Sequence, residues 1–192
     1  MAISLGQAKG RGNAALSDDG NWSWSSKGMT AAAALAEAQK LGDAWIAGNR
    51  LESRSGAYSI NWRHYELGPI SINLLRVSPQ RVERTAEMAR TDRKKSYELV
   101  LMRGGRAQIV HGDQETELTG DSLILLDSTR PWSLEFGEGS YCQSAHMSAD
   151  WVTRWLPTAD TVAGSPIFTQ RGWAMPLRAM FGAMAEDGID AA

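Results

Sequence analysis

The middle of the chain alternates between short apolar runs and tight turns. Residues 97–102 form an almost continuous apolar run, which two glycines at 104 and 105 interrupt. Apolar and polar positions then alternate over residues 106–110, and a turn at 119–121 leads into a second apolar run at 122–126. Short runs bounded by glycine and aspartate are typical of β-strands, so this spacing predicts a β-meander.

The same alternation appears on both sides of this block. It occurs at residues 58–63 and 70–74, on either side of a Leu-Gly-Pro turn, and a further strand is expected at 141–147. These segments predict additional strands of the same barrel.

Apolar positions at helical spacing predict three helices, over residues 30–48, 149–156 and 175–185. Thr30 and Ser148 stand where the first two helices begin, and both residue types are good N-caps. The expected fold class is therefore mainly β with flanking helices, in one domain that begins at residue 30.

Residues 1–29 are rich in glycine, serine and asparagine and lack periodicity, which favours a mobile N-terminal tail. Trp22 and Trp24 are the exception. Being two apart, they can lie on one side of an extended segment and dock on the barrel or on a neighbouring chain. The alternative is a tail anchored by a single ring.

The order of these turns and strands resembles a known family. An apolar strand at 97–102, a glycine turn, a Leu-to-Asp turn at 118–121, an apolar strand at 123–126 and an Asp-Ser-x-Arg-Pro corner at 127–131 follow one another. This succession is similar to the N-terminal regulatory domain of AraC-family transcription regulators, and the similarity covers roughly residues 31–185. It implies a cupin-like, jelly-roll β-barrel that senses a small-molecule effector.

The resemblance also implies partners. Family members carry dimerisation helices after the barrel and then a helix-turn-helix domain, whereas this chain ends at Ala192. We therefore expect a truncated or naturally short sensor in which residues 175–185 begin the dimerisation region. The full-length protein is expected to be a homodimer that contacts DNA only through a domain absent here.

Composition narrows the choice of function. The chain has 20 basic and 22 acidic residues, so a net charge of −2 gives no broad attraction for nucleic-acid phosphates. The single Cys142 cannot form an internal disulfide and is expected in the core. No signal pattern and no run of about 18 apolar residues is present, which favours a cytoplasmic protein without a membrane partner.

A cupin-type metal-dependent enzyme is an alternative function. Such a site needs clustered histidines and a carboxylate, but His64, His111 and His146 are far apart in sequence and form no His-x-His pair. His111 is expected to be exposed in a turn. No nucleophile motif stands out, so we expect no metal, no cofactor and no catalysis.

Strand parity supplies candidates for a ligand pocket in the barrel. Trp62 and His64 share one face, and Arg76 shares the parity of the apolar positions 70, 72 and 74. The remaining candidates are Trp132, Tyr141 and His146. For the aromatic and histidine residues, a plain core role is the alternative.

Arg76 gives the sharpest hypothesis. A cation on an apolar face needs an anionic partner, either a protein carboxylate or the carboxylate of a ligand. We therefore expect an aromatic or carboxylated effector. Asp127 and Arg84 are predicted to be structural instead, the first in the turn before Pro131 and the second as a packing or salt-bridge residue. A ligand-free dimerisation module remains a further alternative.

Overall fold

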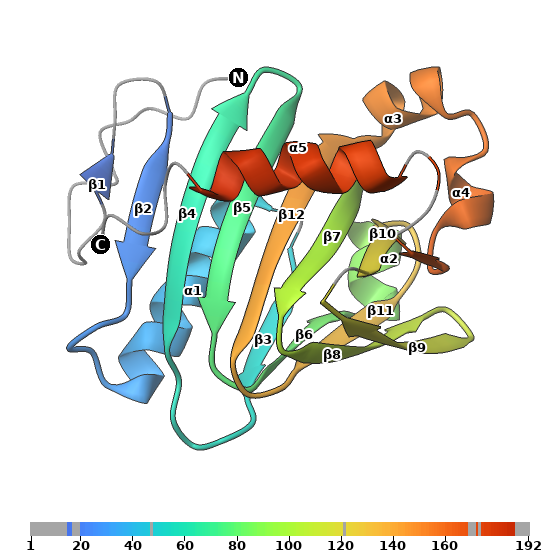
Figure 1. Ribbon diagram of the computed structural model, residues 1–192. Coiled ribbons are helices and arrows are strands. Elements are labelled where there is room, and N and C mark those ends of the chain that lie inside the picture. Colours follow the sequence, from blue (N-terminus) through green and yellow to red (C-terminus); the bar gives the residue numbers. More distant parts are fainter. Residues whose placement is uncertain are drawn as a thin grey trace.

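Two antiparallel sheets enclose the core of the protein (Figure 1). The computed structural model describes residues 15–16, 20–46, 48–120, 122–168, 172 and 174–186. Within these residues, the larger sheet has eight strands in the order β1 (Ala15–Leu16), β2 (Trp22–Ser25), β4 (Ile60–Leu67), β5 (Ile70–Val77), β12 (Ser140–Ser148), β7 (Ser96–Gly104), β10 (Ser122–Asp127) and β13 (Pro166–Phe168).

The smaller sheet has five strands in the described part of the chain. Their order is β3 (Arg50–Ser53), β6 (Gln80–Arg84), β11 (Trp132–Phe136), β8 (Arg106–His111) and β9 (Gln114–Thr119). Side chains on the facing sides of the two sheets form the main core, which includes Trp62, Met102, Ile109, Leu126 and Leu134. The predicted jelly-roll class is confirmed by this arrangement.

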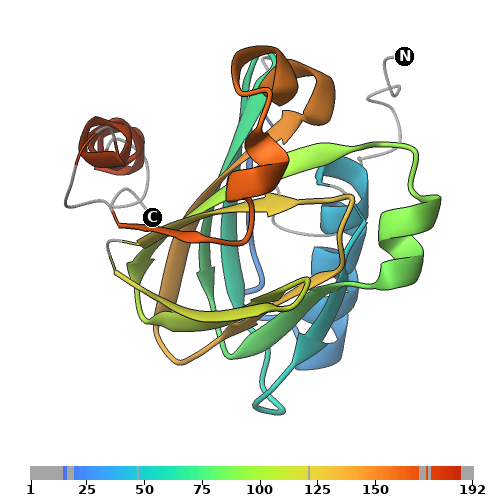
Figure 2. The ribbon, with the colours of Figure 1, turned by 90° about the vertical axis from the view of Figure 1, so that its right-hand side faces the viewer.

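Helix α1 (Ala31–Trp45) and helix α5 (Ala174–Glu186) lie on opposite sides of the larger sheet (Figure 2). Thr30 caps α1 as predicted, because its hydroxyl accepts a hydrogen bond from the Ala33 N–H at 3.3 Å. Ala34 and Ala38 bury the inner side of α1 against the main core. The small side chains let the helix come close to the strands.

Helix α5 covers the outer face of the larger sheet (Figure 1). Phe181 and Leu177 pack there against an apolar cluster made of Ile72, Leu74, Leu101, Leu123 and Ala145. The Gln143 amide donates to the Phe181 carbonyl at 2.7 Å, which ties the helix to β12. Both faces of the central strands are therefore buried, as a near-continuous apolar run requires.

Three shorter helices complete the described fold: α2 (Ala86–Thr91), α3 (Ala149–Trp155) and α4 (Ala159–Val162). Ser148 caps α3 as predicted, accepting from the Trp151 N–H at 3.3 Å. The expectation for the N-terminal tail needs correction, because residues 22–25 form β2 rather than a mobile segment. Residues 1–14 and 17–19 of that tail lie outside the described residues.

The physical reason for this correction is burial. Trp22 and Trp24 pair with His64 and Trp62 across β2 and β4, and both indoles are buried. Burying two indoles on one side of a strand stabilises the folded protein by more than it costs to order the polar residues between them. Both rings dock, so the single-ring alternative is wrong.

Candidate ligand-binding cavity

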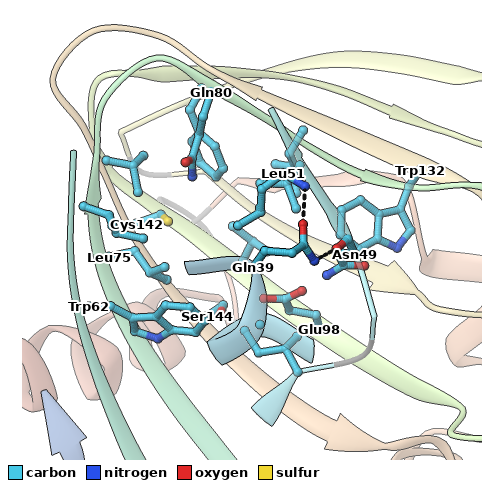
Figure 3. Close-up of a pocket in the computed structure, with 18 residues that line it drawn as sticks. Gln39, Asn49, Leu51, Trp62, Leu75, Gln80, Glu98, Trp132, Cys142 and Ser144 are labelled. Carbon is cyan, nitrogen blue, oxygen red and sulfur yellow. Dashed lines mark hydrogen bonds between the residues drawn. The ribbon is translucent and has the colours of Figure 1, made fainter. Parts of the chain in front are cut away.

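A cavity of about 70 Å³ lies between the two sheets, beside the C-terminal half of α1 (Figure 3). It has room for several water molecules or a small organic molecule. Both sheets and α1 contribute to its wall. The wall consists of Gln39, Gly42, Ile46, Asn49, Leu51, Ile60, Trp62, Leu75, Val77, Gln80, Val82, Glu98, Val100, Trp132, Leu134, Phe136, Cys142 and Ser144.

Gln39 fixes the segment that follows α1 against the cavity. Its amide nitrogen donates to the Asn49 carbonyl, and its amide oxygen accepts from the Leu51 N–H at 2.9 Å. These two bonds attach the helix to the start of β3 (Figure 3). The position of Asn49 on the cavity wall therefore depends on α1.

Two amide oxygens on the wall have no hydrogen-bond partner among the residues that the structure describes. They are Asn49 Oδ1 and Gln80 Oε1, and both atoms are buried. The Gln80 residue is only 2% exposed. Because a buried acceptor without a partner costs free energy, these two oxygens favour a bound donor in the cavity.

Glu98 is the ionisable acid of this wall. Its side chain lies on the inner face of β7, is half-buried and borders the cavity. Burial raises the pKa of Glu98, and a hydrogen bond with the Ser144 hydroxyl opposes that rise. Burial at this wall thus shifts the carboxyl toward its neutral form.

A buried polar network stands behind the wall. The Trp62 indole N–H donates to Asn73 Oδ1 at 2.9 Å, and the Asn73 amide nitrogen donates to Ser144 Oγ at 3.5 Å. Both ring nitrogens of His64 lie 2.9 Å from oxygen atoms, Nδ1 from Asn73 Oδ1 and Nε2 from Glu66 Oε1. The network holds the Trp62 ring in one orientation and reaches Glu98 through Ser144.

The candidate pocket residues predicted from the sequence differ in their position relative to the cavity. Trp62 and Trp132 line the cavity, whereas His64 is fully buried behind the wall in the polar network. His146 borders a smaller adjoining space of about 10 Å³, together with Asn49, Glu98 and Trp132. Burial lowers the pKa of His146, and the nearby His64 adds to that effect.

Arg76 and Tyr141 do not lie in the cavity. Arg76 shares the face of Ile72 and Leu74 as predicted, but that face is the outer one, which is apolar because α5 covers it. At the end of β5 the Arg76 side chain is exposed, and its guanidinium lies 4.4 Å from the centre of the Tyr141 ring. The expected convergence of Arg76 with Trp62 and Trp132 is therefore wrong.

His111 also differs from expectation. It is the last residue of β8 and is only 2% exposed, so its predicted place in an exposed turn is wrong. His111 Nε2 accepts a hydrogen bond from the Asp127 N–H at 3.1 Å. Asp127 fulfils its predicted structural role, since its Oδ1 accepts from the Thr129 N–H at 2.8 Å.

Arg84 has a structural role, as predicted. The buried guanidinium donates to the carbonyls of Ser128 at 2.7 Å and Gly48 at 2.8 Å, and it forms a 3.1 Å ion pair with Asp92. Cys142 is buried in the core as expected, and burial raises the pKa of its thiol.

Sequence reasoning missed five polar residues of the wall: Gln39, Asn49, Gln80, Glu98 and Ser144. Glu98 had a usable signal, because it is a single carboxyl in the otherwise apolar run at 97–102. The three amides had none, since amides are common in loops and at strand ends.

Two further properties of the described residues bear on function. They include no group of three or more His, Cys, Asp or Glu side chains placed to hold a metal ion. None of the helices in the described ranges is long and apolar enough to span a membrane.

Comparison with known families fits this architecture. The model of the AraC-binding-like domain matches residues 40–189. The chain belongs to this family. None of the curated proteins matches this AraC-binding-like domain in sequence.

The fold also occurs in a solved structure. The AraC-like transcriptional activator CuxR aligns with a TM-score of 0.73 over 90% of this chain at 13% identity, a level that shows the fold alone. The AraC-binding-like chain spans 62% of that activator's length. The cupin domain of Schizosaccharomyces pombe Cnp3 aligns at a TM-score of 0.39 and 7% identity, over 51% of this chain and 71% of its own.

Proposed function

We propose that this chain is the effector-sensing domain of an AraC-type transcription regulator and that it binds a small molecule in the cavity between its sheets. The role is regulatory rather than enzymatic. The observation that carries the proposal is the cavity itself, an apolar and aromatic space with a few convergent polar groups. Membership of the AraC-binding-like family supports the regulatory part of the proposal.

The connection between α1 and the cavity supports a mechanism. Gln39, Gly42 and Ile46 of α1 form part of the wall, and Gln39 also fixes Asn49 and Leu51. A ligand that fills the cavity would favour one position of α1 over others. By this population shift it would change how a linked DNA-binding unit is presented.

We further propose that the complete regulator is a homodimer to which α5 contributes. Leu177 and Phe181 pack on the sheet, while Met175 and Met180 are exposed at 59% and 49% on the same helix. Sedimentation of this chain should show weak association that Met180→Lys abolishes. A tight dimer that Met180→Lys leaves intact would assign dimerisation to another surface.

A thermal-shift screen of small metabolites tests ligand binding. A true effector should raise the melting temperature, with stabilisation of about 2.7 kcal/mol at a concentration a hundredfold above Kd. The variant Leu75→Phe places a ring in the cavity and should abolish the shift. The control Leu67→Phe alters a leucine that is 49% exposed and should keep it. A hit that survives Leu75→Phe would refute binding in the cavity.

A further inference from the structure

The Glu98 carboxyl lies on the cavity wall, together with the amides of Asn49 and Gln80. Asn49 Oδ1 and Gln80 Oε1 have no hydrogen-bond partner among the described residues. The Gln39 amide is already used on both of its ends by Asn49 and Leu51. A ligand that brings donors would therefore satisfy groups that are otherwise left unpaired.

Positively charged side chains are absent from this wall in the described part of the chain. None of the residues that line the cavity is lysine, arginine or histidine. A carboxylated ligand would lose its hydration without gaining a cation on this wall, and this disfavours the carboxylated effector expected from the sequence.

Aromatic rings complete the site. Trp62 and Trp132 both belong to the wall, and the Trp62 indole N–H is already bonded to Asn73. The indole therefore offers its ring rather than its N–H to the cavity. Indole rings attract both hydrocarbon and organic cations.

Asn49 and Glu98 lie at one end of the cavity. Asn49, Glu98 and Trp132 border both the main cavity and the smaller space beside His146, whereas Gln80 borders only the main one. Figure 3 shows Asn49 and Glu98 together and Gln80 on the other side of the space. This arrangement separates an end that carries a carboxyl group from an apolar middle formed by Leu75, Cys142 and their neighbours.

Resting on the sensor function proposed above, the geometry points to a small primary ammonium compound as the effector class. Its ammonium group donates to the Glu98 carboxylate and to Asn49 Oδ1, and its hydrocarbon part lies against Trp62 and Trp132. A second donor at the far end of the ligand would bond to Gln80 Oε1.

Binding of a cation is coupled to a proton. Glu98 favours its neutral form in the empty cavity, so an ammonium ligand displaces the carboxyl proton to solvent as it binds. The titratable groups of β12 nearest to Glu98 are His146, its cross-strand neighbour, and Cys142. Burial keeps both neutral, and the charges of Glu66, Arg84 and Lys94 act on His146 in turn.

Three probes that share a chain of four carbon atoms test the assignment: n-butylamine, 1-butanol and butyrate. Each is titrated into the full chain and followed through the indole N–H signals in NMR spectra. Butylamine should bind most tightly. Its affinity should rise with pH until Glu98 is ionised in the free protein. Glu98→Gln should weaken butylamine about 10- to 100-fold and remove this pH dependence. The matched control Glu115→Gln, at an exposed position on β9, should change neither property.

Other outcomes separate this inference from the sensor function. If butanol or butyrate binds at least as tightly as butylamine and Glu98→Gln has no effect, the ammonium assignment is wrong while the sensor function stands. If none of the three binds, the ammonium assignment is again overturned. The sensor function then also falls if the metabolite screen gives no hit that depends on the space beside Leu75.

Discussion

The indole of Trp22 stacks on the imidazole of His64, with ring centroids 5.1 Å apart and an angle of 15° between the ring planes. The two residues are direct cross-strand partners on β2 and β4. Trp45 of α1 contacts both rings, at 6.2 Å from Trp22 and 5.0 Å from His64. The stack therefore joins the N-terminal strand, the first helix and the polar network behind the cavity.

Trp22→Ala should destabilise the protein by about 3 to 5 kcal/mol, the usual cost of removing a buried large aromatic side chain. The indole is only 4% exposed and packs on Trp45, Trp62 and His64. Urea unfolding measures the effect. Trp155→Ala is the matched control, because that indole is 74% exposed and its removal should cost much less. Equal costs for the two variants would mean that β2 is not part of the cooperative core.

Arg84→Met should cost about 3 to 5 kcal/mol of stability, because it removes the buried guanidinium that donates to Asp92 and to the carbonyls of Ser128 and Gly48. Asp92 should then titrate at higher pH, since its hydrogen bond and ion pair with Arg84 help to lower its pKa. The control is Arg81→Met, which removes a partly exposed ion pair with Glu83 and should cost at most about 1 kcal/mol. Chemical denaturation compares the variants.

Much of the fold was predictable because its central strands carry a strong signal. The apolar run at 97–102 became the inner part of β7, and the predicted caps Thr30 and Ser148 begin α1 and α3. Strands β3, β6 and β9 were not predicted. They belong to the smaller sheet, where polar side chains interrupt the apolar pattern and one face remains open to solvent.

The ligand-binding site was less predictable than the fold. The alternation of side chains along a strand shows which residues share a face, but it does not say which face points inward. Arg76 was placed correctly relative to Leu74, but both lie on the outer face. The apolar character of that face comes from α5, a helix distant in sequence. Asn49 and Gln80 reach the cavity only through the packing of α1 and the smaller sheet, which no local pattern encodes.

Stability should fall as the pH drops below about 6.5, the usual pKa of histidine. Burial lowers the pKa of both His111 and His146 in the folded protein, so the unfolded chain binds protons first. The stability is present above that pH and is lost toward the folded pKa values. Urea unfolding at pH 7.5, 6.5 and 5.5 measures the slope. His146→Leu should reduce this slope of stability against pH. An unchanged slope would contradict the prediction that His146 is neutral in the folded protein.

Glu98→Gln should make the empty protein more stable at neutral pH. Burial raises the folded pKa of Glu98, so from about pH 4.3, the usual pKa of glutamate, the folded protein holds a proton that the unfolded chain has lost. Stability therefore decreases as the pH rises from that value through the folded pKa, and a neutral glutamine that can still bond to Ser144 removes the loss. Unfolding free energies of both proteins from pH 5 to pH 8 should diverge as the pH rises. Glu115→Gln should follow the wild type, because Glu115 is exposed. Parallel curves for Glu98→Gln and the wild type would show that Glu98 is ionised without penalty, and the cavity would then already hold a counter-charge for an ammonium ligand to displace.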